Sequence, residues 1–170
     1  MSRSGSWQRL NPNSSRSVAH PEGRDPTSSE LEANLLASRT TSLCRAQQRA
    51  GGFWSIENPK SSLVWGFEPL ASLLRFGIDV DFDQCMYGLR TDPEPSAALV
   101  KKATRLRTNM HSLKGLEITC SKDHGHQRCG GKLRTPLGWI NRSSLAGQYP
   151  ADLCDAWAAF ARTSLENSGR

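Results

Sequence analysis

The feature that most constrains this chain is an apolar run at residues 51–59 (Gly-Gly-Phe-Trp-Ser-Ile-Glu-Asn-Pro), which ends in a carboxylate, an amide and a proline. The run predicts a buried strand over 53–56 that Pro59 stops. Glu57 and Asn58 then follow the carboxyl end of the strand, where open α/β sheets bind their ligands. A desolvated carboxylate at that place is suited to hold or donate a proton, whereas a solvated one is only a strand terminus. Both interpretations stay open on this run alone.

Helical patterns flank this run on both sides. A Ser-x-x-Glu capping box at Ser29 and Glu32 opens a helix that Gly51 ends. The apolar face of this helix is expected to consist of Leu31, Leu35, Leu36, Leu43 and Cys44. Residues 61–76 predict a second helix, interrupted near its glycine or its proline.

Two further strands are expected downstream. Residues 78–82 alternate apolar and polar side chains, and 104–108 predict a strand that pairs with them. Residues 110–150 are glycine-rich and loop-like, and Asp152 is expected to cap a final helix. The order helix, strand, helix, strand predicts an α/β fold with a partial Rossmann-like sheet, flanking helices and a loop-rich, basic C-terminal region.

Composition divides the chain into two parts. Residues 1–28 are rich in Ser, Arg, Pro, Gly and Asn, and are expected to be disordered or extended, whereas 29–166 form one folded domain. The sequence has no apolar run near 18 residues and no signal-peptide pattern, which predicts no membrane partner. An odd number of cysteines without compact spacing favours reduced thiols and an intracellular protein, nuclear or cytoplasmic. The cysteines are Cys44, Cys85, Cys120, Cys129 and Cys154.

Positive charge is concentrated in one segment. The whole chain carries +6, but residues 101–142 contain ten Lys or Arg against two acids, which leaves +8 there. Such an excess predicts contact with a phosphate backbone, of DNA or else of RNA, and the first cations of the segment are Lys101, Lys102, Arg105 and Arg107. The alternative is a scaffold domain whose basic face only keeps it in solution.

A cluster of metal-ligand residue types lies inside this segment. Cys120, His124, His126 and Cys129 supply the two thiols and two imidazoles of a structural zinc site. Their spacing, Cys-x3-His-x-His-x2-Cys, is not a common zinc-finger pattern, and four ligands so close in sequence would strain a tetrahedron. Cys85 replaces one ligand if the loop folds back onto the sheet edge. The alternative is a polar loop with incidental thiols.

Most aromatic side chains fall on apolar faces and are expected in the core; they include Trp54, Trp65, Trp157 and Phe160. Trp139 differs, because it lies in a glycine-rich loop. It is the aromatic residue that we single out for base stacking.

Several segments occur in an order that carries a family resemblance. They are residues 55–59, 84–88 (Gln-Cys-Met-Tyr-Gly), 102–109, Cys120 with His124 and His126, and 146–154. In this order they resemble the C-terminal half of cytosine-5 DNA methyltransferase-like proteins, especially the divergent type of phages and mobile-element polyproteins. The resemblance spans residues 16–154, and the ordered series is more specific than any one piece.

The resemblance implies roles for particular residues. In this family a cysteine thiolate attacks C6 of a flipped cytosine, and a glutamate of a Glu-Asn-Pro or Glu-Asn-Val motif contacts N3. Glu57 corresponds to that glutamate, and Asn58 to the turn that orients it. Lys102, Thr104 and Arg105 correspond to the segment that supports the base pocket and the DNA backbone. The resemblance thus implies a methyltransferase-like sheet in which Glu57 and Asn58 are catalytic residues.

Two parts of the family pattern are not found in the sequence. It contains no Pro-Cys dipeptide for the nucleophile, and no Gly-rich turn after an N-terminal strand for S-adenosylmethionine. We therefore expect a truncated methyltransferase-like fragment, inactive alone, whose missing N-terminal half would supply the cofactor site. The alternatives are a basic nucleic-acid-binding module of mobile-element origin and a non-enzymatic scaffold domain.

Overall fold

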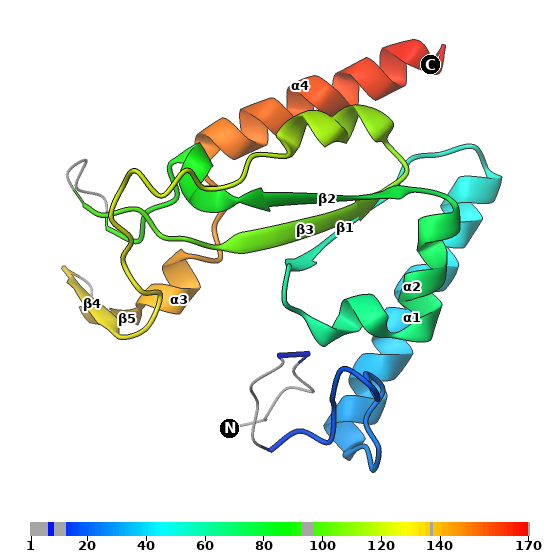
Figure 1. Ribbon diagram of the computed structural model, residues 1–170, viewed down its shortest axis with the longest axis horizontal. Coiled ribbons are helices and arrows are strands. Elements are labelled where there is room, and N and C mark those ends of the chain that lie inside the picture. The colour runs from blue at the N-terminus through cyan, green and yellow to red at the C-terminus, as the bar shows by residue number, and fades with distance from the viewer. Residues whose placement is uncertain (1–6, 9–12, 93–96, 137, 170) are drawn as a thin grey trace. The chain divides into compact units, whose positions relative to one another are not determined.

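The computed structural model describes residues 7–8, 13–92, 97–136 and 138–169 (Figure 1). The chain divides into two compact units. The first comprises residues 1–79 and 106–110, and the second comprises residues 80–105 and 111–170.

A three-stranded sheet contributes residues to both units. Its strands are β1 (Ser55–Pro59), β2 (Ile78–Asp83) and β3 (Ala103–Thr108), and their order in the sheet is β1-β3-β2. The predicted pairing of the last two strands is confirmed, since β3 lies beside β2. The first strand begins two residues later than predicted and runs through Pro59, so Glu57 and Asn58 lie within it.

Helical segments of the first unit precede and follow β1 in the chain, and Ile56 of this strand packs against residues from them. They are α1 (Ser28–Arg49), the 3-10 helix η1 (Leu63–Gly66), α2 (Glu68–Ala71) and the 3-10 helix η2 (Ser72–Arg75). The prediction of an interrupted helix over 61–76 is confirmed, because this range holds the three short segments η1, α2 and η2. The core of this unit has two clusters, one around Trp65 and Leu70 and one around Trp54 and Leu73.

The helix α1 starts and packs differently from the prediction. Its capping box is formed by Thr27 and Glu30 rather than by Ser29 and Glu32. The predicted apolar face is wrong for most of its members, because these leucines are 49–71% exposed: Leu31, Leu35, Leu36 and Leu43. The helix instead buries a stripe of mostly small residues: Glu30, Ala37, Thr41 and Cys44.

The segment before α1 has no helix or strand among its described residues. Residues 1–6 and 9–12 lie outside the described part, so the prediction of disorder there is not addressed. The remainder is folded onto α1, because Arg16 is 7% exposed and donates to the Pro21 carbonyl and to the Asn34 side chain, at 2.6 and 2.8 Å.

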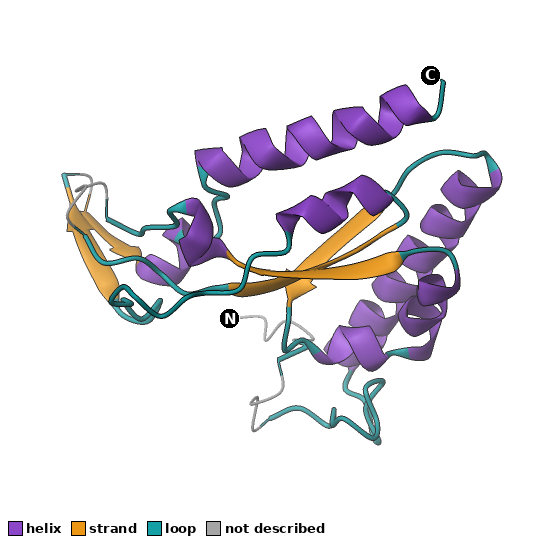
Figure 2. Ribbon diagram, turned by 45° about the horizontal axis from the view of Figure 1, so that its top comes forward, coloured by secondary structure: helices purple, strands orange, loops and turns teal. Residues whose placement is uncertain are grey.

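The second unit is built around two helical segments that lie side by side, η4 (His111–Leu116) and α4 (Ala151–Asn167) (Figure 2). The Ser112 hydroxyl donates to the Phe160 carbonyl, and Leu113, Leu116 and Leu153 are fully buried. Pro150 is the N-cap of α4 and makes no side-chain cap. The prediction that Asp152 caps this helix is therefore wrong.

The region predicted as loops contains regular structure. It holds η4, the strands β4 (Lys132–Thr135) and β5 (Gly138–Asn141), and the short helix α3 (Arg142–Leu145). The two strands form an antiparallel hairpin. The fold is thus mixed α/β, as predicted, whereas a Rossmann-like arrangement of the larger sheet remains a prediction.

Candidate metal centre and nucleic-acid-binding residues

Four potential metal ligands converge in the second unit. They are Cys85, Cys120, His124 and His126, and one ligand atom from each lies within 4.8 Å of the others. The Cys120 sulfur is 3.8 Å from His124 Nε2 and 3.4 Å from His126 Nε2. A tetrahedral zinc ion with ordinary Zn–S and Zn–N bonds would separate a sulfur and a nitrogen by about 3.6 Å. The cluster therefore has both the ligand types and the separations of a metal site.

Backbone contacts hold the ligands in place. Cys85 lies in the 3-10 helix η3 (Gln84–Tyr87), directly after β2. The backbone N–H of Cys120 donates to Asp83 Oδ2 at 2.9 Å, next to the end of the same strand. His126 forms an isolated bridge with Leu99. Three separate segments of the chain thus meet at the cluster.

His124 carries the second contact that metal-bound histidines usually make. Its Nδ1 lies 2.7 Å from a carboxylate oxygen of Asp123. Since an ionised carboxylate only accepts, Nδ1 is the donor, which leaves Nε2 of the neutral ring as the atom suited to bind a metal. The Ser121 hydroxyl and then His124 lower the pKa of Asp123, which keeps this acceptor ionised.

Burial and the Cys120 thiol both act on the thiol of Cys85. Burial, and then the hydrogen bond and charge of Cys120, raise the pKa of Cys85 to about 11. Without a metal, the Cys85 thiol is thus protonated at neutral pH, and a bound metal ion would displace this proton.

The fourth predicted ligand is not in the cluster. Cys129 packs against a separate apolar group that contains Leu89, Val100 and Ala146. The structure brings Cys85 to the cluster instead, which is the replacement that a folded-back loop allows. Because Cys85 is far from the other ligands in sequence, the four no longer have to come from one short loop.

Glu57 keeps an unsatisfied oxygen. Its Oε1 atom is buried and has no hydrogen-bond partner among the described residues. An unpaired buried acceptor costs free energy, so an atom of this kind is a candidate for a functional role. Asn58 follows it in β1 and is half-buried.

Two of the predicted phosphate-binding residues are engaged in bidentate ion pairs. Arg107 is 1% exposed, and its Nε and Nη2 atoms donate to the two oxygens of Asp79 at 2.7 and 2.9 Å. Arg105 makes the same two-pronged contact with Asp81, at 2.7 and 2.9 Å, and its side chain is 25% exposed. The buried Arg107 cannot reach a phosphate without unfolding, so its role is structural.

The other three predicted contacts occupy different environments. The Lys101 side chain is 41% exposed, with its ammonium 3.7 Å from Asp83. The Lys102 ammonium lies 5.5 Å from the centre of the Tyr149 ring. Thr104 is fully buried, and its hydroxyl accepts from the Gln84 side chain. Of the five, only the two lysines keep accessible cations outside a bidentate ion pair.

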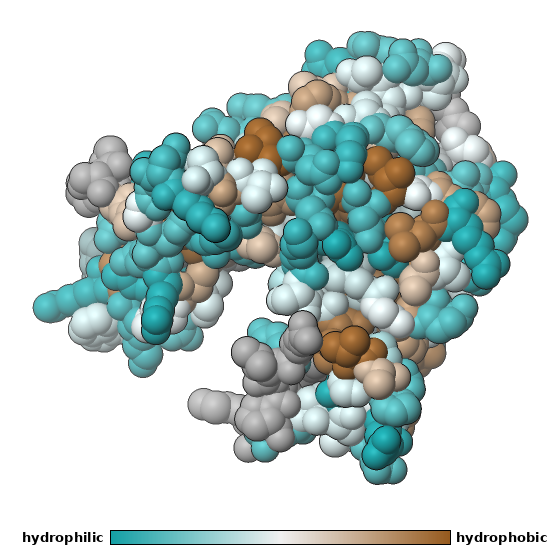
Figure 3. Space-filling view, viewed as in Figure 1, coloured by the Kyte–Doolittle hydropathy of each residue, from teal (hydrophilic) through white to brown (hydrophobic). Residues whose placement is uncertain are grey.

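Exposed cations continue beyond the cluster. They are Lys122, Arg128, Lys132 and Arg134. Residues 124–151 contain no Asp or Glu, so no acid of this stretch offsets Arg128, Lys132 and Arg134, whereas Lys122 precedes Asp123. In Figure 3 the visible face over β4 and β5 is mainly hydrophilic.

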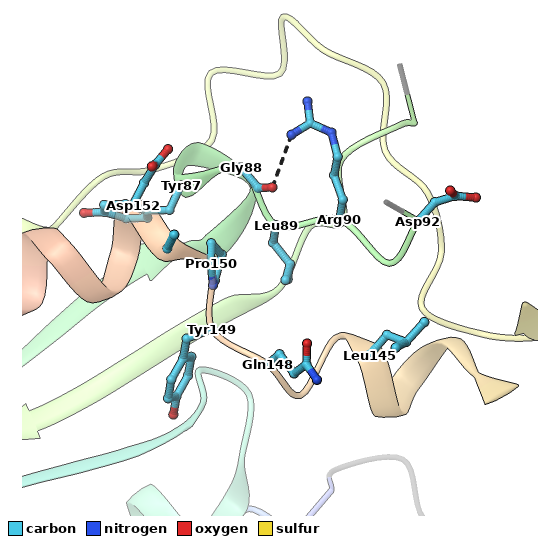
Figure 4. Close-up of a pocket in the computed structure, with 11 residues that line it drawn as sticks. Tyr87, Gly88, Leu89, Arg90, Asp92, Leu145, Gln148, Tyr149, Pro150 and Asp152 are labelled. Carbon is cyan, nitrogen blue, oxygen red and sulfur yellow. Dashed lines mark hydrogen bonds between the residues drawn. The ribbon is translucent and has the colours of Figure 1, made fainter. Parts of the chain in front are cut away.

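A pocket of about 630 Å³ lies where residues 87–92 meet residues 145–152 (Figure 4). Two residues of its lining are hydrogen-bonded, since the Arg90 guanidinium donates to the Gly88 carbonyl at 3.3 Å. The Tyr87 hydroxyl donates to the Leu116 carbonyl, so this group is committed to the fold. The pocket is lined by acidic, basic and apolar side chains.

No protein-family model, no curated protein and no solved structure matches this chain. Within the described residues, none of the helices combines the length and the apolar character needed to cross a bilayer.

Proposed function

We propose that the second unit is a zinc-stabilised module that binds nucleic acid. The observation that supports this most is the group of Cys85, Cys120, His124 and His126. Two thiolates and two imidazoles complete a tetrahedron without an open position, which is the form of structural zinc sites. In this proposal the ion has no catalytic step and instead fixes the loop that carries three of its ligands, Cys120, His124 and His126.

The position of this loop connects the metal to binding. His124 and His126 stand at the start of the stretch without acids, and Lys122 and Arg128 flank them. A zinc ion bound to Cys85 at the end of β2 would hold these cations in fixed positions. Fixed cations neutralise phosphates at a lower entropic cost than those of a mobile loop.

A salt titration of fluorescent duplex anisotropy tests this proposal. Replacing both Lys122 and Arg128 with Gln should lower the affinity and reduce the slope of log affinity against log salt by about two. Lys114→Gln is the matched control, because that ammonium is 2.7 Å from Glu117 and already paired. Removing zinc with a chelator should weaken binding as well. Absence of binding at about 50 mM salt, or binding that the double variant leaves unchanged, would favour the scaffold interpretation.

A second candidate function is the recognition of a target cytosine by a methyltransferase-like protein. The buried, unpartnered Oε1 of Glu57 favours it. A carboxyl group at the end of an apolar run is suited to contact the Watson–Crick edge of a flipped base. In the described part of the chain no strand with a Gly-rich turn precedes α1, so these residues do not fit S-adenosylmethionine and no transfer step is assigned to them.

Duplexes with one mismatched cytosine test this second candidate, because an unpaired base is cheaper to extrude. The wild-type chain should bind the mismatched duplex more tightly than the fully paired one. Glu57→Gln should remove this preference and leave the affinity for paired DNA unchanged, whereas Glu32→Gln, at an exposed position of α1, should keep it. Equal affinities of the wild type for the two duplexes would contradict the role of Glu57.

A further inference from the structure

The β4–β5 hairpin presents two chemically different faces. Arg134 lies directly opposite Trp139, and Lys132 opposite Asn141. Directly opposed residues of an antiparallel pair point to the same side, as do residues two apart on one strand. These four side chains therefore share one face, and Leu133 and Ile140 lie on the other.

The face that carries Trp139 is open to solvent. Trp139 is 67% exposed, more than the other exposed aromatic residues in the described part of the chain, Phe76 and Tyr149. Lys132, Arg134 and Asn141 are exposed too. Because the nearest acids along the chain are Asp123 and Asp152, both well outside the hairpin, the face has two cations and no carboxylate of its own.

We propose that this hairpin face binds unpaired bases of single-stranded nucleic acid. Trp139 stacks on a base, Lys132 and Arg134 contact the phosphates on either side, and the Asn141 amide hydrogen-bonds to a base edge. The proposal rests on the nucleic-acid binding proposed above and specifies the kind of strand that is bound.

The combination of residues decides between strand types. Cations alone attract single and double strands through the same counterion release. An exposed indole adds stacking energy to the binding of single strands only. The bases of a duplex are already stacked on their neighbours, whereas those of a single strand offer free faces. This stacking energy depends little on base sequence, because every base has such a face. Trp139 should therefore set the preference for single strands and the two cations the overall affinity.

Anisotropy titrations with a fluorescent oligothymidylate and a blunt duplex test the proposal on the full chain. Trp139→Leu keeps an apolar side chain but removes the aromatic ring, and should weaken single-strand binding about tenfold while changing duplex affinity less than about twofold. Trp139→Phe restores a ring and should recover most of the loss. Ile140→Ala, on the opposite face of the same strand, is the matched control and should bind the single strand as the wild type does. The oligothymidylate should also quench tryptophan fluorescence in the wild type and not in the Trp139→Phe chain.

Each other outcome would overturn the proposal. If Trp139→Leu binds single strands as tightly as the wild type, or loses single-strand and duplex affinity equally, the stacking role is refuted while nucleic-acid binding itself stands. If neither probe binds to the wild type, the proposed function fails together with this inference. Binding to anionic vesicles that Trp139→Leu abolishes, with no effect on oligothymidylate, would assign the face to a membrane surface instead.

Discussion

The carboxylate of Glu30 is expected to contribute strongly to the stability of the first unit. It accepts hydrogen bonds from the Ser14 hydroxyl at 2.6 Å, from the Ser15 backbone at 3.1 Å and from the Thr27 backbone at 2.9 Å. The Arg16 guanidinium lies 3.8 Å away, and the Glu30 side chain is 4% exposed. A single carboxylate thus joins the segment before α1 to the first turn of that helix, and Glu30→Gln removes its charge with little change of shape.

The expected loss follows from the pKa of this group. Burial acts to raise the pKa of Glu30, but hydrogen bonds from Ser14, Thr27 and Ser15 outweigh it and lower the pKa from 4.5 to about 2. A shift of this size corresponds to about 3 kcal/mol of unfolding free energy. Because the folded-state pKa is the lower one, this contribution is complete above pH 4.5 and is lost as the pH falls toward 2.

Urea unfolding followed by circular dichroism measures this contribution. Glu30→Gln should lower the unfolding free energy by about 3 kcal/mol at pH 7, and the difference from wild type should shrink steadily as the pH falls below 4.5. Glu32→Gln is the control, since Glu32 lies in the same helical turn and is exposed. A difference for Glu30→Gln that is the same at pH 3 as at pH 7, or no larger than that of the control, would refute the reasoning.

Two further predictions concern ion pairs and chemistry. Asp79→Asn should cost about 3 kcal/mol or more in urea unfolding, because it leaves the buried Arg107 without its counter-charge. Asp81→Asn should cost less than about 1 kcal/mol, because its partner Arg105 is partly exposed, and equal losses for the two variants would contradict this difference. With S-adenosylmethionine and cytosine-containing DNA, the purified chain should transfer no methyl group above background. Transfer that Glu57→Gln abolishes would show that the chain is an enzyme after all.

Local signals in the sequence predicted the elements that local chemistry determines. The helix from Ser28 was predicted with its capping box two residues too late, because the Ser29 to Glu32 pattern overlaps the true box of Thr27 and Glu30. The buried face of this helix was predicted wrongly. Small residues can pack more closely against a neighbouring helix than the leucines that periodicity favours. Which face is buried depends on a tertiary partner, and one helix sequence does not specify it.

The charge pattern of β2 and β3 is a sequence signal for ion pairs between these strands. Asp79 and Asp81 alternate on β2 as Arg105 and Arg107 do on β3, and opposite charges at alternate positions of paired strands form ion pairs. Since the pairing of these strands was predicted, the neutralisation of both arginines followed from it. The hairpin was harder to foresee, because four-residue strands with one or two apolar positions give almost no periodicity.

The candidate metal site combines local and distant information. Cys120, His124 and His126 were predicted from their spacing, because a short loop keeps them close in any fold. Cys85 and Cys129 are the same residue type, and only the path of the chain between β2 and the loop decides which of them reaches the cluster. The sequence allowed Cys85 as a replacement for one ligand, but it did not indicate which cysteine would bind the metal.

The measurement that tests the account most directly is the zinc content of the purified protein, by elemental analysis, in the wild type and in matched cysteine variants. We expect about one zinc per chain in the wild type. Cys85→Ser and Cys120→Ser should both lose it, whereas Cys129→Ser, a thiol of the same segment that packs in a separate apolar group, should retain it. A wild type without zinc after exposure to the metal, or a Cys129→Ser chain that loses zinc while Cys85→Ser keeps it, would contradict the proposed centre.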